Sequence, residues 1–245
     1  MRLLIVPAAG RGSRLGGDTP KPLVHVNGKS MLDHLADLYD PFVDGLVVVA
    51  HPSFAADIET WGRARGNVTV AMQLRPTRML DAIMAAAPAI AEYSPDQVWI
   101  TWADQVGVLP ETIRRLEKAE AGEPAPALVL PTVPRPDPYI HFPRDAAGRI
   151  SGLLQRREGD RMPAEGESDM GLFAMPLSTF EGDLAEFAAS VPVGTGTGER
   201  NFLPFVPWLA QRKTVVTFPC TDPAEAVGIN TPEDLQQVEA WLRTR

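Results

Sequence analysis

Residues 3–15 read LLIVPAAGRGSRL, an apolar run followed at once by a glycine-rich segment. The run Leu3–Val6 is typical of a buried β-strand, and Pro7 ends it because proline cannot donate a hydrogen bond to a sheet. Gly10 and Gly12 allow the backbone to bend sharply and to bring its N–H groups close to an anion. This order of strand and loop favours an α/β sheet that binds its ligand at the carboxyl ends of the strands.

Apolar runs and helical patterns alternate through the first half of the chain. Strands are predicted at residues 45–50, 68–72 and 98–101. Helices are predicted after the N-cap Ser30, around Phe54, Ile58 and Trp61, from about 79 to 91, and from Pro110. Alternation of this kind implies parallel strands joined by right-handed crossovers. We therefore expect a Rossmann-like open, mainly parallel sheet flanked by helices.

The second half of the chain is less regular and is rich in proline. Strands are predicted at residues 128–132, 150–154, 171–174 and 215–218, and a last helix follows Thr231 as its N-cap. No Gly/Ser-rich linker and no internal repeat divide the chain. We expect a single domain over residues 1–245 whose later half decorates the sheet.

Composition argues against several classes of function. The 245 residues carry a formal net charge of -8, which disfavours nucleic acid or an anionic membrane as a partner. The single cysteine, Cys220, excludes a disulfide framework and a multi-cysteine metal site, and it fits a cytoplasmic location. The chain has no apolar stretch near the ~18 residues of a membrane span.

The glycine-rich segment reverses this acidic balance locally. Arg11, Arg14 and Lys21 place cations close to the flexible glycines, a combination that suits a polyphosphate. Two familiar phosphate motifs do not fit, because a dinucleotide fingerprint needs glycine at Leu15 and a Walker A loop needs it at Leu23. An ordinary glycine turn with solvated arginines is the structural alternative.

A longer pattern resembles the signature of the nucleotidyltransferases. It comprises AAGRGSRL at 8–15, DTPKPL at 18–23 and the pair Gly28-Lys29, with a short spacing similar to that of the UDP-N-acetylglucosamine pyrophosphorylase branch. Members of this family couple a nucleoside triphosphate to a phosphorylated sugar or alcohol and release pyrophosphate. The resemblance implies these partners, Mg²⁺ as cofactor, a nucleotide-binding half at 1–120 and an acceptor-binding half at 121–245. Whether the chain forms a homo-oligomer stays an open question at this point.

The resemblance also assigns residues to tasks. Arg14 and Lys21 become the catalytic cations, and Asp104 and Asn230 the metal ligands. The nucleotide-binding residues are Ala8, Ala9, Gly10, Arg11, Gly12, Ser13, Gln73, Thr77 and Arg78. The acceptor-binding residues are Tyr139, Gln155, Asp169 and Gly171. Taken singly, Asp104 is equally compatible with a turn residue, whereas Asn230 is better explained as a turn residue before the Thr231 N-cap. Lys21 is also compatible with a solvated lysine.

Four positions depart from the pattern of the N-acetylglucosamine enzymes. Arg78 stands where relatives usually have glycine, and Ile140, Gln155 and Asp169 replace an expected glycine, glutamate and asparagine. Gln155 can donate hydrogen bonds that a carboxylate cannot, and Asp169 adds a negative charge. We therefore expect a different sugar or polyol phosphate as acceptor. The alternatives are a cytidylyltransferase acting on a phosphorylated polyol or amino alcohol, and a nucleotide sensor without turnover.

Overall fold

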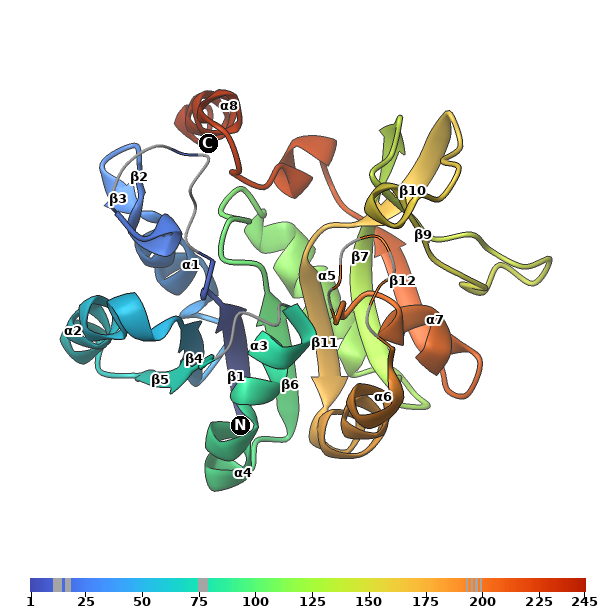
Figure 1. The fold of residues 1–245 in the computed structure, drawn as a ribbon, viewed down its shortest axis with the longest axis horizontal. Helices are drawn as coiled ribbons and strands as arrows, with labels where there is room; N and C mark the ends of the chain where they lie inside the picture. Colours follow the sequence, from blue (N-terminus) through green and yellow to red (C-terminus); the bar gives the residue numbers. More distant parts are fainter. Residues whose placement is uncertain are drawn as a thin grey trace.

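The computed structural model describes residues 1–10, 15, 19–74, 79–192, 194, 196, 198 and 200–245. Its centre is an eight-stranded sheet in the order β10-β7-β11-β6-β1-β4-β5, with β12 paired to β7 (Figure 1). The strands are β1 (Arg2–Pro7), β4 (Gly45–Ala50), β5 (Val68–Met72), β6 (Gln97–Thr101), β7 (Leu128–Pro136), β10 (Glu165–Asp169), β11 (Leu172–Pro176) and β12 (Val215–Pro219). Two small ladders join β2 (His25–Val26) to β3 (Lys29–Ser30) and β8 (Ile140–His141) to β9 (Leu154–Gln155).

Helices cover both faces of this sheet (Figure 1). They are α1 (Met31–Tyr39), α2 (Ala55–Arg65), α3 (Met79–Ala85), α4 (Ala87–Tyr93), α5 (Pro110–Glu120), α6 (Ala185–Ser190), α7 (Phe205–Ala210) and α8 (Pro232–Arg243). Short 3₁₀ turns span Lys21–Leu23, Pro52–Phe54, Arg156–Glu158 and Pro223–Ala226, and a π-helical segment spans Thr179–Leu184. Within the described residues, no helix has both the length and the apolar character needed to cross a membrane.

Alternate residues of the central strands point to opposite faces of the sheet. Leu4 and Val48 pack into a core shared with α1, α5 and α8. Ile5 and Val47 pack into a second core shared with α3, α4, α6 and α7. A strand buried on both faces is apolar at every position, which is why these segments are continuous apolar runs. β1, β4, β5 and β6 are parallel, so the expected mainly parallel α/β sheet is confirmed.

Local sequence signals mark the starts of α1 and α8. Ser30 accepts a hydrogen bond from Asp33 N–H and forms a capping box at the start of α1, as Thr231 does with Asp234 at α8. The helix expected over 79–91 is instead two helices, α3 and α4. Pro88 lies in the first turn of α4, where its missing N–H is tolerated, whereas a continuous helix would place it in the interior.

Two expectations for the second half are wrong. Residues 150–154 do not form a strand, because Ile150 makes only an isolated bridge to Arg144 and regular pairing begins at Leu154. Gly152 interrupts the apolar run and weakens the strand. The second half also does more than decorate the sheet, since it supplies β7, β10, β11 and β12. The sheet is mixed there, as β11 runs antiparallel to β6.

A bulge separates β10 from β11, which both run antiparallel to β7. Asp169 pairs with Thr132 and Ala174 with Val129, so this side advances five residues while β7 advances three. Within the bulge, Gly171 has a φ of +73°, and a Cβ there would lie 2.3 Å from Cδ1 of Trp102. Only glycine allows the Trp102 ring to lie this close to the strand.

Replacing Gly171 by alanine is expected to destabilise the fold by about 1–3 kcal/mol, because the new methyl group overlaps Trp102. Thermal unfolding should show a Tm several degrees below that of the wild type. Gly182→Ala is the matched control, since a Cβ at Gly182 meets no atom within 4 Å. Equal Tm values for the two variants would contradict this role of Gly171.

Candidate active site

The start of the glycine-rich loop and Gln73 lie at the same end of the strands. We call this side of the sheet, where the parallel strands have their carboxyl ends, the carboxyl edge. Ala8 N–H donates to the Val49 carbonyl oxygen at 2.8 Å, and Gln73 N–H donates to the Ala50 carbonyl oxygen at 2.9 Å. Both acceptors lie at the carboxyl end of β4. Gln73 is buried at this edge.

For several of the predicted nucleotide-binding residues, the assignment stays a prediction from the sequence. From Ala8, which is buried, the loop passes Ala9 to Gly10, which is exposed. The remaining loop residues, Arg11, Gly12, Ser13 and Arg14, and the pair Thr77 and Arg78 lie outside the described residues.

Lys21 lies in a turn flanked by prolines, near the carboxyl ends of the strands. It opens the 3₁₀ turn Lys21–Leu23 between Pro20 and the buried Pro22, and Leu23 N–H donates to the Pro20 carbonyl oxygen at 2.8 Å. Proline fixes φ on both sides of the lysine and so limits the conformations of its backbone. The side chain of Lys21 is 16% exposed.

Asp104 lies in a turn directly after β6. Gln105 N–H donates to the Trp102 carbonyl oxygen at 3.1 Å and closes this turn, and the buried Ala103 anchors it. β6 is the neighbour of β1 in the sheet, so the turn and the glycine-rich loop leave adjacent strands. Asp104 therefore follows the strand that lies next to β1.

Asn230 reaches the same place from the C-terminal part of the chain. Its N–H donates to Asp234 Oδ2 at 2.9 Å, which ties it to the first turn of α8. Its side-chain amide donates to the Gly228 carbonyl oxygen at 3.2 Å. This bond directs the Nδ2 atom away and leaves Oδ1 free to accept from a cation.

These three side chains meet. The Lys21 ammonium donates to Asp104 Oδ2 at 2.5 Å and to Asn230 Oδ1 at 2.9 Å. Two oxygen atoms from loops far apart in the sequence thus converge on one cation. Oxygen ligands of this kind suit Mg²⁺, which takes one or two protein groups and keeps water and phosphate oxygens as its other ligands. Among the described residues, no group of three or more His, Cys, Asp or Glu side chains is placed to hold a metal.

The predicted acceptor residues form two connected groups. Gln155 of β9 pairs with Ile140 of β8, next to Tyr139, whose ring lies 5.3 Å from the Arg157 guanidinium. The side-chain oxygen of Gln155 accepts a hydrogen bond from Asn201 Nδ2. This contact uses the side-chain oxygen of Gln155, and the donor role of its amide N–H groups toward an acceptor stays a prediction.

Asp169 and Gly171 form the second group around Trp102. Asp169 Oδ2 accepts from Gly171 N–H at 3.0 Å, and the carboxylate also hydrogen-bonds the Trp102 side chain. Burial raises the pKa of Asp169, while these hydrogen bonds and the charge of Arg135 oppose that rise. Phe202 packs edge-on against Trp102 with ring centroids 6.0 Å apart. Since Asn201 precedes Phe202, this segment links the two acceptor groups.

Residues 4–169 match the family model of the MobA-like NTP transferase domain. The chain belongs to this family of NTP transferases. The bifunctional protein GlmU of Pseudomonas entomophila is 27% identical over 248 residues, and that of Alkalilimnicola ehrlichii is 28% identical over 254 residues. These alignments cover 99% and 98% of this chain but 52% of each relative. The chain therefore spans about half the length of the curated relatives it matches.

Membership of the MobA-like NTP transferase family confirms the resemblance to nucleotidyltransferases at the level of the family. The matched range contains the glycine-rich loop, Lys21, Asp104 and Asp169, whereas Asn230 lies beyond it. No role was assigned to Trp102, Asn201 or Glu225 from the sequence, and the structure shows them in contact with the loops of the site. A sequence signal for Glu225 was available, since an acid three residues after Asp222 is the pattern of a capping box.

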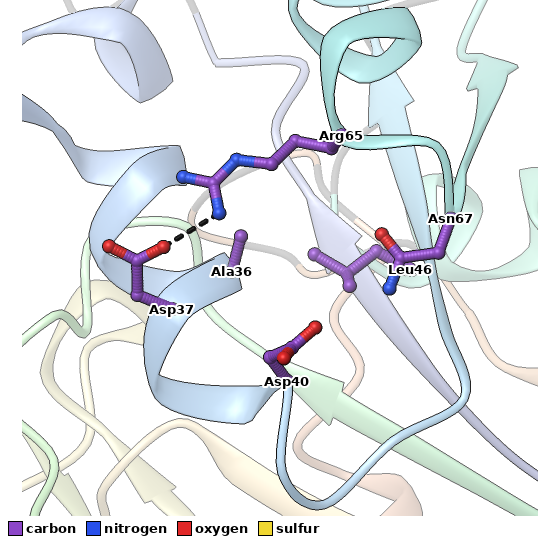
Figure 2. A pocket seen from close by; sticks show the side chains of 6 residues that line it. All are labelled: Ala36, Asp37, Asp40, Leu46, Arg65 and Asn67. Carbon is purple, nitrogen blue, oxygen red and sulfur yellow. Dashed lines mark hydrogen bonds and ion pairs between the residues drawn. The ribbon is translucent and has the colours of Figure 1, made fainter.

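A separate hollow of about 300 Å³ lies at the opposite edge of the sheet (Figure 2). It is lined by Ala36, Asp37, Asp40, Leu46, Arg65 and Asn67. Figure 2 shows Arg65 directed at Asp37, to which it donates at 2.6 Å. Hydrogen bonds from Lys29 and Arg65 lower the pKa of Asp37. The charge of Arg65 in this hollow is thus neutralised by carboxylates of the protein. The hollow is remote from the loops that carry Lys21 and Asp104.

The contacts of Lys21 lead to a prediction about metal binding. Asp104 and Asn230 offer Lys21 the same oxygen atoms that a divalent cation would use. A hydrogen bond to a charged group contributes roughly 1.5–3 kcal/mol, so Lys21→Met should strengthen Mn²⁺ binding by about tenfold or more. Calorimetry without nucleotide measures this affinity.

Lys29→Met is the control for this experiment. Lys29 is an exposed lysine paired with Asp37 at 2.8 Å, away from the site, and its loss should leave the affinity unchanged. Equal Mn²⁺ affinities in the wild type and Lys21→Met would show that lysine and metal do not share these oxygens.

Proposed function

We propose that the chain is a nucleotidyltransferase that couples a nucleoside triphosphate to a sugar 1-phosphate, releases pyrophosphate and forms a nucleoside diphosphate sugar. The observation that carries this proposal is the meeting of Lys21, Asp104 and Asn230 at the carboxyl ends of the parallel strands. Membership of the MobA-like NTP transferase family and the alignment with GlmU proteins over nearly the whole chain support the same class of reaction.

The reaction brings two anions together, so its main requirement is charge neutralisation with in-line placement. A phosphate oxygen of the acceptor attacks the α-phosphorus, and pyrophosphate leaves. Lys21 neutralises the triphosphate, and the amides of the loop after Ala8 bind its oxygens; Arg14 has the same task on the basis of the sequence. Asp104 and Asn230 would hold Mg²⁺, which supplies further charge neutralisation at the phosphates when bound. The acceptor phosphate is already ionised and needs no general base.

The direct test is pyrophosphate release with each of four nucleoside triphosphates against a panel of sugar 1-phosphates and polyol phosphates. We expect Mg²⁺-dependent release with at least one pair. Lys21→Ala should lower kcat on the order of 10²-fold, because a charge contact to the transition state is lost. Asp104→Ala should remove both activity and its Mg²⁺ dependence.

The same panel tests the alternatives. Tight nucleotide binding without release for any pair would favour a sensor and reject the proposed turnover. Full activity of Asp104→Ala would remove this residue from the metal site. Release with cytidine triphosphate and a polyol or amino-alcohol phosphate alone would favour the cytidylyltransferase.

The carboxylate of Asp169 is the feature that favours an acceptor other than N-acetylglucosamine 1-phosphate. This carboxylate is fixed by Gly171 and Trp102, and burial raises its pKa. A carboxylate accepts hydrogen bonds from hydroxyl or ammonium groups, whereas an asparagine both donates and accepts. A site built with the carboxylate therefore selects an acceptor rich in donors at this position.

Asp169→Asn is expected to change the choice of acceptor and to leave the choice of nucleotide unaltered. The ratio of kcat/KM values between a donor-rich polyol phosphate and an N-acetylated sugar phosphate should shift by roughly 10-fold or more. Steady-state kinetics with both acceptors measure the ratio. An unchanged ratio with a changed KM for the nucleotide would assign Asp169 to the nucleotide side.

A further inference from the structure

Glu225 is a fully buried carboxylate next to the site. Its exposed fraction is 0%, and it lies in the 3₁₀ turn Pro223–Ala226. One oxygen, Oε1, accepts from Asp222 N–H at 2.8 Å, and the other, Oε2, accepts from Leu109 N–H at 2.8 Å. Burial of a carboxylate is costly unless both oxygens are hydrogen-bonded, so these bonds determine where the side chain lies.

The Glu225 bond to Leu109 joins the two loops that carry Asp104 and Asn230. The loop from Asp104 to Leu109 precedes α5, and the loop from Asp222 to Asn230 precedes α8. Ile229 N–H donates to the Asp104 carbonyl oxygen at 3.2 Å, so the loops meet at both ends.

Further contacts make this junction tight. Trp241 of α8 donates from Nε1 to the Gly107 carbonyl oxygen at 3.1 Å. A Cβ at Gly228 would lie 3.4 Å from both the Asp104 carboxylate carbon and Asn230 Nδ2. From β7, Arg135 donates to the Ala226 carbonyl oxygen. A small displacement of the 222–230 loop therefore moves Asn230 relative to Asp104.

We infer that Glu225 is a positioning residue that sets the separation of the Asp104 and Asn230 oxygens by tying the Asn230 loop to the Leu109 N–H. This inference rests on the function proposed above, in which these oxygens hold the metal. Glu225 does not contact the metal or the substrates; it acts through the backbone of the two loops. Among the contacts between these loops, it is the one made by a fully buried charged side chain.

The decisive variant is Glu225→Gln, which keeps the shape of the side chain. Its amide NH₂ cannot accept from either Leu109 or Asp222, so one of the two bonds is lost and two donors face each other. Loss of a group that orients metal ligands typically costs 10–100-fold in metal affinity. We expect the Kd for Mn²⁺, measured by calorimetry without nucleotide, to rise by about tenfold.

Glu120→Gln is the matched control. Glu120 is a second buried carboxylate; it accepts from Trp99 Nε1 at 2.6 Å and pairs with Arg2. Since Arg2 begins β1, this group lies at the opposite edge of the sheet from Asp104. Both glutamine variants should lower Tm, whereas only Glu225→Gln should weaken Mn²⁺ binding. In turnover assays, Glu225→Gln should raise the Mg²⁺ concentration for half-maximal rate and recover kcat at saturating Mg²⁺.

Leu109→Pro tests the same bond from the other side, should Glu225→Gln fail to fold. Leu109 has φ -87° and ψ 143°, values close to those of a proline, and Pro110 follows it. The substitution deletes the N–H that Glu225 accepts and keeps the carboxylate. It should also raise the Kd for Mn²⁺.

The outcomes separate this inference from the proposed function. Glu225→Gln or Leu109→Pro with a lowered Tm and the Mn²⁺ affinity of the wild type would overturn the inference, as would a wild type that binds no Mn²⁺. A selective loss of Mn²⁺ affinity in a protein that releases no pyrophosphate supports the inference and rejects the proposed turnover.

Discussion

Parallel pairing of β1 with β6 is the constraint on which the site depends. Ile5 pairs with Ile100 in this ladder, so the loops that follow the two strands start side by side at one edge of the sheet. One loop leads to Lys21 and the other begins with Asp104, although these residues are 83 positions apart in the sequence. The C-terminal segment completes the arrangement, because Asn230 reaches Lys21 across 209 positions. The charged Lys21–Asp104 hydrogen bond and the bond from Lys21 to the neutral amide oxygen of Asn230 together join the three loops.

Buried carboxylates lie near both the amino and the carboxyl ends of the central strands, with different contacts. Glu120 at the amino edge bonds Trp99 and Arg2, and burial raises its pKa although both partners oppose this. Its contacts join α5 to the first strand and so act on the fold. At the carboxyl edge, Glu225 accepts only backbone N–H groups in the contacts described above, and these belong to the loops of the site. Buried carboxylates thus join helix α5 to β1 at the amino ends of the strands and join two loops at their carboxyl ends.

Much of the first half could be predicted from local patterns. The apolar run at 45–50 coincides with β4, which is buried at every position because helices cover both of its faces. The run at 68–72 coincides with β5, a partly exposed strand at the end of the sheet order. The prediction of one helix over 79–91 was wrong because the missing N–H of Pro88 outweighed a composition that favours helix. In the second half, the apolar run at 150–154 carried the same kind of signal as a strand, yet its pairing depended on partners that local sequence does not reveal.

The sequence by itself determined the order of elements, the glycine-rich loop and the residue types of the candidate site, since these depend on local propensity and on a motif of fixed spacing. It also marked Lys21, Asp104 and Asn230 as separate positions, each with an ordinary turn as an alternative. Only the tertiary structure decided that the three side chains touch, that Trp102 fills the space left by Gly171, and that Glu225 joins two loops. The physical reason is that these contacts form between residues distant in sequence, and the pairing of strands together with the packing of loops fixes which of them meet.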